Sequence, residues 1–281
     1  MNKSRRIHEQ LQSVDSIDSI THILESIASI RIRQIKDEVL GSREFFQRLW
    51  AIFSQLRVSE RDIGRTTSQA KSGRQAVVLI TANAGLTGEV DTHLIAKVFS
   101  EVDPKNTDFI VYGMHGENLL LQRGIKPVKV FRFPEIGAPI DVNECVQAIS
   151  GYQTPVVYYP SYSALTVQEI SRLPLIDAVQ TLGASEKDIS AEQIIFKDNT
   201  IFEPSISEVV DYLERMMIGT ILTEIILESN LAQYSSRFNA MTAASSRASN
   251  MSKTLRRQYL KTKRYESDES NRRFKHRKVA V

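Results

Sequence analysis

The stretch "VVLITANAGLTGEVD", from Val77 to Asp91, decides the fold class of the middle of the chain. An apolar run ends in small residues, Gly85 and Gly88 follow, and helix-compatible residues come next. This order predicts a β-strand, a tight turn and the start of a helix, which is the layout that cradles phosphates in nucleotide-binding enzymes. The stretch therefore raises the question of whether the turn holds a nucleotide or only redirects the chain.

Short runs of β-branched and aromatic residues recur on both sides of this stretch and alternate with helix-like segments. The alternation predicts an α/β domain over residues 74–203, with a small, Rossmann-like, mostly parallel sheet. Segments 164–177 and 192–199 are expected as later edge strands, with an antiparallel arrangement left open. The inner strands are expected within 75–82, 108–114, 128–133 and 154–162, and the helices between them within 87–102, 115–124 and 138–151.

Residues 1–73 are predicted to form a long helix followed by a polar linker. Apolar residues recur there every three or four positions, which is typical of one face of a helix. The polar stretch 55–74 predicts a mobile connection to the sheet domain. The expected apolar stripe consists of Ile7, Leu11, Val14, Ile17, Ile20, Leu24 and Ile27.

Residues 204–281 are predicted to form a second long helix with a basic tail. Ser205 followed by Glu208 is a capping-box pattern, and the helix is expected to run to about Arg264. Its heptad-like spacing predicts that the two long helices flank the sheet domain and pair as an antiparallel coiled coil. The expected seam consists of Leu231, Tyr234, Phe238, Met241, Ser245, Ala248, Met251, Leu255 and Tyr259.

The overall composition excludes several classes of protein. A net charge of +3 is too small to indicate nucleic-acid binding by itself, although the segment "NRRFKHRK" concentrates positive charge near the end of the chain. The single cysteine, Cys145, cannot form an internal disulfide and is expected to be buried. The N-terminus shows no secretory signal. The apolar segment 216–227 is flanked by charged residues, so it predicts a buried helix and no direct transmembrane segment.

Both long helices and the glycine turn resemble the gamma subunit, or central stalk, of rotary F-type ATP synthases. The turn keeps the family's Thr81, Gly85, Leu86 and Gly88. After Tyr265 the resemblance ends, because the family's apolar tip is replaced by a strongly charged segment, as in a divergent or alternative member. The N-terminal matches are Ile7, Leu11, Ser13, Val14, Ile20, Thr21, Leu24, Glu25, Ile27, Ala28, Arg31, Ile32 and Arg33; the C-terminal matches are Ser236, Arg237, Phe238, Ala240, Met241, Ala244, Arg247, Ala248, Leu255, Tyr259, Lys261, Lys263 and Arg264.

The resemblance implies a rotor shaft that has no catalytic residues, cofactor or metal of its own. Its rotation would couple ion flow through the membrane ring to ATP synthesis or hydrolysis. The implied partners are the alpha and beta subunits of the catalytic hexamer, an epsilon-type subunit and the membrane c-ring, at the cytoplasmic face of the cell membrane. The expected subunit-interface residues are Leu24, Ile27, Ala28, Arg31, Arg33, Arg237, Met241, Arg247, Tyr259, Lys261, Lys263 and Arg264.

Two other functions compete with this interpretation. A nucleotide-dependent α/β enzyme would use the glycine turn, but no Lys-Ser/Thr follows it, and Glu89 and Asp91 place negative charge there. A coiled-coil protein that binds polyanions through its basic tail would show strongly salt-dependent binding. We expect the basic tail to be a solvated segment and not a polyanion-binding site, so no nucleic-acid partner is expected.

Overall fold

The computed structural model describes the chain as two compact units, and each is considered by itself. One unit comprises Met1–Ser29 and Arg237–Val281, and the other comprises Ile30–Ser236. Two long helices, α1 (Lys3–Leu56) and α6 (Ile206–Val279), contribute residues to both units. The described backbone covers residues 3–56, 73–133, 140–175, 177–178, 203 and 205–279.

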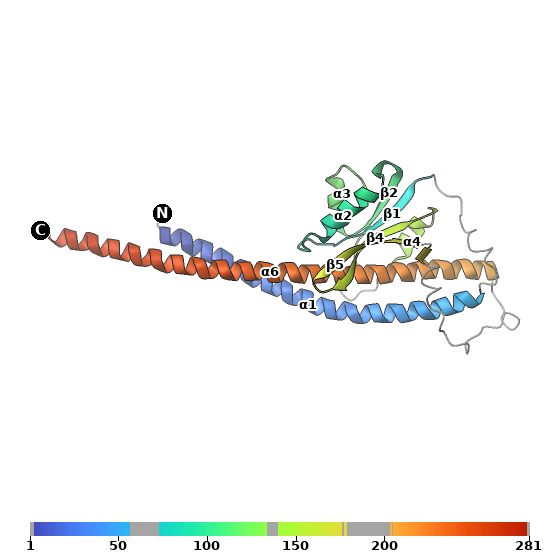
Figure 1. Ribbon diagram of the computed structural model, residues 1–281, viewed down its shortest axis with the longest axis horizontal. Coiled ribbons are helices and arrows are strands. Elements are labelled where there is room, and N and C mark those ends of the chain that lie inside the picture. Colours follow the sequence, from blue (N-terminus) through green and yellow to red (C-terminus); the bar gives the residue numbers. More distant parts are fainter. Residues whose placement is uncertain are drawn as a thin grey trace. The chain divides into compact units, whose positions relative to one another are not determined.

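The larger unit contains a five-stranded sheet in the order β3-β2-β1-β4-β5 (Figure 1). Strands β3, β2, β1 and β4 run parallel, and β5 pairs antiparallel with β4 at one edge, so the expected α/β class with a mostly parallel sheet is confirmed. The expected strand at 192–199 lies outside the described residues. The strands are β1 (Gln75–Ile80), β2 (Thr107–Tyr112), β3 (Lys129–Phe131), β4 (Val156–Ala164) and β5 (Val167–Pro174).

Alternation along β1 divides the core of this unit into two layers. Val77 and Leu79 face a cluster with Leu94 of α2 and Leu120 of α3, on the side where Figure 1 shows these two helices. Since successive side chains of a strand point to opposite faces, the intervening residues of β1 face the second layer. The helices of the first layer are α2 (Val90–Glu101) and α3 (Met114–Leu121), and a short 3-10 turn, η1 (Pro104–Asn106), precedes β2.

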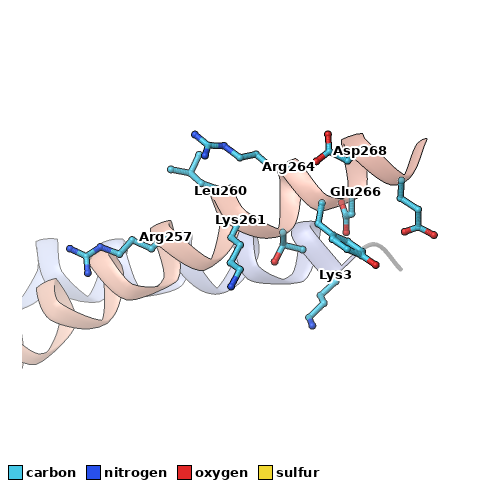
Figure 2. A pocket seen from close by; sticks show the side chains of 10 residues that line it. Lys3, Arg257, Leu260, Lys261, Arg264, Glu266 and Asp268 are labelled. Atoms are coloured by element: carbon cyan, nitrogen blue, oxygen red, sulfur yellow. The ribbon is translucent and has the colours of Figure 1, made fainter. Parts of the chain in front are cut away.

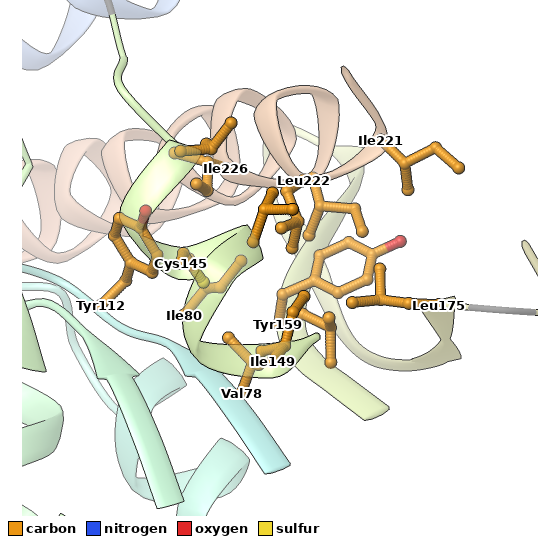
Figure 3. Packing of buried hydrophobic residues seen from close by; sticks show 14 of the residues in the cluster. Val78, Ile80, Tyr112, Cys145, Ile149, Tyr159, Leu175, Ile221, Leu222 and Ile226 are labelled. Atoms are coloured by element: carbon orange, nitrogen blue, oxygen red, sulfur yellow. The ribbon is translucent and has the colours of Figure 1, made fainter. Parts of the chain in front are cut away.

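The second layer combines α4 (Asn143–Ile149) with the first third of α6. Val78 and Ile80 of β1 pack there with Cys145 of α4 and with Ile221 and Ile226 of α6 (Figure 3). The apolar segment 216–227 is therefore a buried helix, as expected from its charged flanks. Within the described residues, no helix combines the length and the apolar character that a bilayer crossing requires.

The first turn of α6 shows the predicted capping interaction. The Glu208 amide donates to the Ser205 hydroxyl at 3.3 Å, and that hydroxyl donates to the Glu208 carboxylate at 3.2 Å. The Ser205 oxygen thus satisfies one of the free amide groups at the helix N-terminus. At the other end, α6 continues to Val279, so the expected end of the helix at about Arg264 is wrong and the charged segment after Tyr265 is helical.

Candidate functional site

The smaller unit is a two-helix coiled coil whose seam follows an unbroken heptad pattern on both helices. Val14, Ala248 and Leu255 form its buried apolar centre, with Ile7 and Leu11 packed against them. Near the end of the seam, the rings of His8 and Tyr259 lie 5.2 Å apart. The buried or half-buried positions, spaced alternately three and four apart, are 4, 7, 11, 14, 18, 21, 25 and 28 on α1 and 241, 245, 248, 252, 255, 259, 262 and 266 on α6.

Hydroxyl–carboxylate hydrogen bonds connect the two helices in addition to this apolar centre. They join Ser252 to Asp15 at 2.6 Å, level with this centre, and Ser245 to Asp18 and Thr242 to Glu25, both at 2.8 Å, beyond one end of it. Residue numbers rise along α1 as they fall along α6, so the helices are antiparallel, as predicted. A carboxylate that accepts from a hydroxyl makes a stronger hydrogen bond than a neutral acceptor does. These bonds therefore favour one axial register of the pair.

A fourth bond of the same kind closes the seam in the opposite direction. Here α1 supplies the hydroxyl, and Ser4 donates from both its Oγ and its amide to the two carboxylate oxygens of Glu266, at 2.5 and 3.1 Å. The hydrogen bond from the Ser4 side chain lowers the pKa of Glu266 below its ordinary value. The Ser4–Glu266 pair thus connects the first turn of α1 to α6.

The composition of the seam differs from the prediction at several positions. Ile17, Ile20 and Ile27 of α1 were expected in the apolar stripe, and Met251 of α6 was expected in the seam. All four are exposed, by 46–56%. The seam instead takes Asp18, Thr21 and Glu25, because a carboxylate opposite a serine or threonine of α6 can form a hydrogen bond that isoleucine cannot. Sequence reasoning missed these polar seam residues because the stripe on α1 was built from apolar side chains only.

The outer face of α6 in this unit is basic. Between Glu228 and Glu266 the helix contains no aspartate or glutamate. Lys253, Arg257, Lys261 and Arg264 are exposed and lie three or four residues apart, so they share one face. Three of them line an open hollow of about 930 Å³, where Figure 2 shows them with Lys3 of α1 and Glu266 and Asp268 of α6. Lys253, Arg257, Lys261 and Arg264 are called the basic stripe below.

The predicted interface residues fall into two groups in the structure. Ala28 and Met241 are buried, and Leu24, Arg31, Arg237 and Tyr259 are half-buried. The exposed residues are Ile27, Arg33, Arg247, Lys261, Lys263 and Arg264. Their contacts with other subunits stay a prediction. Lys263 also lies over the Tyr259 ring, with its ammonium nitrogen 5.6 Å from the ring centroid.

The glycine turn after β1 is occupied by a side chain of its own. Asp91, which is 1% exposed, accepts the Ala82 amide at 3.3 Å and lies 2.6 Å from Nδ1 of His115. The hydrogen bond to Asp91 raises the pKa of His115 above its ordinary value. A phosphate bound at this turn would meet the buried carboxylate and would be repelled. The geometry therefore argues against a nucleotide in this turn.

Backbone conformation at the same turn explains Gly88. Gly88 has a φ of 64°, and Leu86 adopts a similar left-handed conformation with a φ of 66°. The carbonyl of the intervening Thr87 accepts a 2.7 Å hydrogen bond from Ser236 of α6. The turn thus fixes the end of β1 against the start of α2 and against α6, which is a structural role.

Both units of the chain match one known protein family. Residues 3–266 match the family described as ATP synthase. The chain belongs to this family. The match includes the coiled-coil seam and the sheet domain, and it stops at Glu266, the last residue of the seam pattern, leaving the charged end of α6 outside it.

Relatives within this family are ATP synthase gamma chains, as the resemblance implied. The gamma chain of Heliobacterium modesticaldum is 25% identical over 263 residues, covering 88% of each chain. The gamma chain of Halothermothrix orenii is 22% identical over 263 residues, with the same coverage. The chain is thus a homologue of ATP synthase gamma chains.

Solved rotor structures have the same fold. A chain in the rotor of the Euglena gracilis mitochondrial ATP synthase aligns with a TM-score of 0.62 at 13% identity, covering 93% of this chain and 98% of that one. A chain in the central stalk and c-ring of the Tetrahymena thermophila enzyme aligns with a TM-score of 0.57 at 15% identity, covering 80% and 99%. At these identities the likeness concerns the fold alone.

Proposed function

We propose that this chain is the central rotor shaft of an F-type ATP synthase. In this role it couples ion flow through a membrane ring to ATP synthesis or hydrolysis in a catalytic hexamer by rotation. The observation that supports the proposal most strongly is the family match over residues 3–266, because it spans the coiled coil and the sheet domain together. The protein supplies geometry, and the catalytic residues belong to other subunits.

Two properties of the coiled coil suit a shaft. Four hydroxyl–carboxylate contacts, from the Ser4–Glu266 pair to the Glu25–Thr242 pair, resist axial slipping of one helix along the other. In addition, the unit is chemically asymmetric, because the basic stripe lies on α6 and the carboxylates of α1 at positions 15, 18 and 25 bond to α6. A ring that surrounds such a unit meets a different surface at each rotational angle.

Acidic surfaces of the ring are the proposed partners of the cationic residues. Arg31, Arg33, Arg237, Arg247, Lys261 and Lys263 are the residues expected to face them, together with Arg264, which was also expected at the subunit interface. Lys253 and Arg257 are proposed in addition, because they lie on the basic stripe with Lys261 and Arg264. Each exposed ion pair contributes only about 0.2–1 kcal/mol, so the interaction depends on several pairs acting together. Leu24, Ile27, Ala28, Met241 and Tyr259 complete the proposed subunit-interface set.

The remaining partners are proposed for the rest of the assembly. The alpha and beta subunits form the hexamer around the shaft, and an epsilon-type subunit and the c-ring contact its sheet domain. The placement is peripheral, at the cytoplasmic face of the cell membrane. The corresponding division of the chain is 1–73 for the first helix and linker, 74–203 for the α/β domain and 204–281 for the second helix and its basic tail.

Co-purification tests this proposal directly. An affinity tag on the chain, expressed in its own cells, should recover catalytic subunits in a ratio of several to each tagged chain, together with ATP hydrolysis. A chain that is recovered alone, or only as a self-associated oligomer, contradicts the proposal. An ATP-dependent rise in the melting temperature of the tagged chain would favour a nucleotide-binding enzyme instead.

A further inference from the structure

One carboxylate joins the two ends of the turn that connects β1 to α2. Asp91, in the first turn of α2, accepts a hydrogen bond from the Ala82 amide at 3.3 Å, and Ala82 lies just after the end of β1. The Ala82 carbonyl accepts the His115 amide at 3.0 Å, so the first turn of α3 is bonded to the same point. The closed shape of the turn between Ala82 and Asp91 therefore depends on the Asp91 side chain.

The negative charge of Asp91 is buried and is balanced by His115. Asp91 is 1% exposed, and its Oδ2 lies 2.6 Å from Nδ1 of His115. The other carboxylate oxygen, Oδ1, is also buried and has no hydrogen-bond partner in the described part of the chain. A buried carboxylate is costly unless it is paired with a cation. The His115 side chain is 29% exposed, so its ring can exchange a proton with solvent while it contacts Asp91.

The other cationic groups on the elements next to α3 have partners of their own. In the described residues of α2, β2 and β3, Lys97 donates to the Ile170 carbonyl at 2.6 Å, Lys129 lies 3.2 Å from Glu144, and His93 lies 3.5 Å from Glu89. The remaining titratable groups on these elements and on α3 are acids or phenols, which cannot balance a carboxylate. They are Glu89, Glu101, Asp108, Tyr112 and Glu117. His115 is therefore the group whose proton decides whether the charge of Asp91 is neutralised.

The middle of the same turn is bonded to α6. The Thr87 carbonyl accepts a hydrogen bond from Ser236 at 2.7 Å, and both residues are buried. A Cβ added at Gly88 would lie 3.4 Å from the Ser236 hydroxyl oxygen, so the turn lies close against the helix. Ser236 and the turn belong to the same compact unit. The Thr87 carbonyl can meet Ser236 only while the turn keeps its shape, so closure by Asp91 also positions the contact with α6.

We infer that the His115–Asp91 pair is a pH-dependent switch, which keeps the β1–α2 turn bonded to α6 while His115 is protonated and releases the turn when His115 loses its proton. Deprotonation leaves the buried Asp91 carboxylate with a neutral partner and an unbonded oxygen, so exposure of the turn to water becomes less costly. The hydrogen bond to Asp91 raises the pKa of His115. The turn is therefore closed below about pH 6.5 and loosens as the pH rises through the folded-state pKa. All the groups belong to this chain, so the switch does not depend on the proposed function.

Thiol labelling of the purified full chain under native conditions tests the inference. Thr87→Cys is a mild probe, because the Thr87 hydroxyl is buried and makes no hydrogen bond in the described structure. Labelling at position 87 is followed by peptide mass spectrometry, and each rate is divided into the rate in denaturant at the same pH, which removes the intrinsic titration of the thiol. We expect this protection to fall at least about threefold between about pH 6 and about pH 9, since a shift of one pKa unit changes the opening equilibrium about tenfold.

Two histidine variants identify the titrating group. His115→Gln keeps a hydrogen-bond donor but cannot titrate, so it should make the protection at position 87 independent of pH. His93→Gln is the matched control, because His93 is the other histidine at this turn and its pair with Glu89 is exposed. This variant should keep the pH dependence. Protection that does not vary with pH before either substitution, or a pH dependence that survives His115→Gln, would overturn the inference.

Hydrogen exchange of the unsubstituted chain provides a second measurement that needs no cysteine. At alkaline pH the Ala82 amide, which donates to Asp91, should be protected at least about tenfold less than the Val78 amide in the middle of β1, because the turn opens without unfolding of the sheet. Equal protection of the two amides at every pH would mean that the turn opens only when the whole domain unfolds, and the inference would fail.

Discussion

Ser245 of α6 donates a 2.8 Å hydrogen bond to the Asp18 carboxylate of α1, across 227 positions of sequence. Both side chains are part-buried, so neither is fully solvated when the bond is lost. This pair occupies a seam position that an apolar coiled coil would fill with leucine or isoleucine. The bond therefore supplies register specificity at a point where the apolar contact is weak.

A double-mutant cycle on Ser245 and Asp18 should measure that contribution. The variants S245A, D18A and S245A/D18A are expected to give a coupling energy of about 0.5–1.5 kcal/mol in chemical denaturation, since a hydrogen bond to a charged group is retained only when both partners are present. Ser246→Ala, at an exposed position beside the seam, is the control for helix propensity. A coupling energy near zero would show that the contact does not stabilise the coiled coil.

The His115–Asp91 pair makes the stability of the sheet domain depend on pH. Because the hydrogen bond to Asp91 raises the pKa of His115, protonated His115 stabilises the folded state. This contribution is fully present below the unfolded pKa of about 6.5 and is lost as the pH rises through the higher folded pKa. Denaturation at a series of pH values above 6 should show the loss, and His115→Gln should abolish it. His93→Gln, on an exposed histidine of the same domain, is the control for the substitution itself.

Gly113 should tolerate no side chain. Its φ is 95°, and an added Cβ would lie 2.2 Å from the Thr81 carbonyl oxygen and 2.7 Å from that of Ala82. Both contacts are with backbone, which cannot move without disturbing β1. We expect Gly113→Ala to lower the free energy of unfolding by at least about 2 kcal/mol. Gly85→Ala is the control, since an added Cβ there meets nothing within 4 Å; similar losses for both variants would contradict the prediction.

Cys145 should be chemically inert in the folded protein. It is fully buried in the second core layer, and burial raises the pKa of its thiol to about 12. Because the thiolate is the reactive form, iodoacetamide should label Cys145 only in denaturant. A cysteine introduced by Ser26→Cys, at an exposed position of α1, should react in the native protein. Rapid labelling of Cys145 without denaturant would show that the core around α4 opens.

The sheet domain could be predicted from the sequence in most respects. Runs such as that ending in Ile80 are apolar, β-branched and bounded by turn residues, so the strands and their mostly parallel arrangement could be predicted from local pattern. The order of the strands within the sheet could not, because it depends on pairing between distant segments. The antiparallel edge strand was left open, because one extended segment can pair in either direction. The covering of the second sheet face by α6 depends on residues 216–227, which only tertiary structure brings to Val78 and Ile80.

The coiled-coil seam was harder to predict, for a physical reason. Helix α1 carries two registers of suitable spacing, one through Val14 and Ala28 and the other through Ile20 and Ile27. The second register is the more apolar, so hydrophobicity alone favours the face of α1 that the structure leaves exposed. The Asp18–Ser245 hydrogen bond and its neighbours select the first, and such pairing between distant residues is not visible in either helix alone.

The basic stripe leads to the last prediction, which concerns assembly. Charge reversal at two of its residues, in the variant K261E/R264E, should weaken binding of the catalytic subunits by about 1–2 kcal/mol, or roughly 5–30-fold, since exposed ion pairs contribute up to about 1 kcal/mol each. The loss should diminish at high salt, where exposed charges are screened. Affinity of the purified chain for the purified hexamer, measured at low and high salt, provides the test. K105E/K126E changes the net charge equally at exposed sites of the sheet domain and should leave this affinity unchanged. If both variants weaken binding alike, net charge rather than the position of the basic stripe determines assembly.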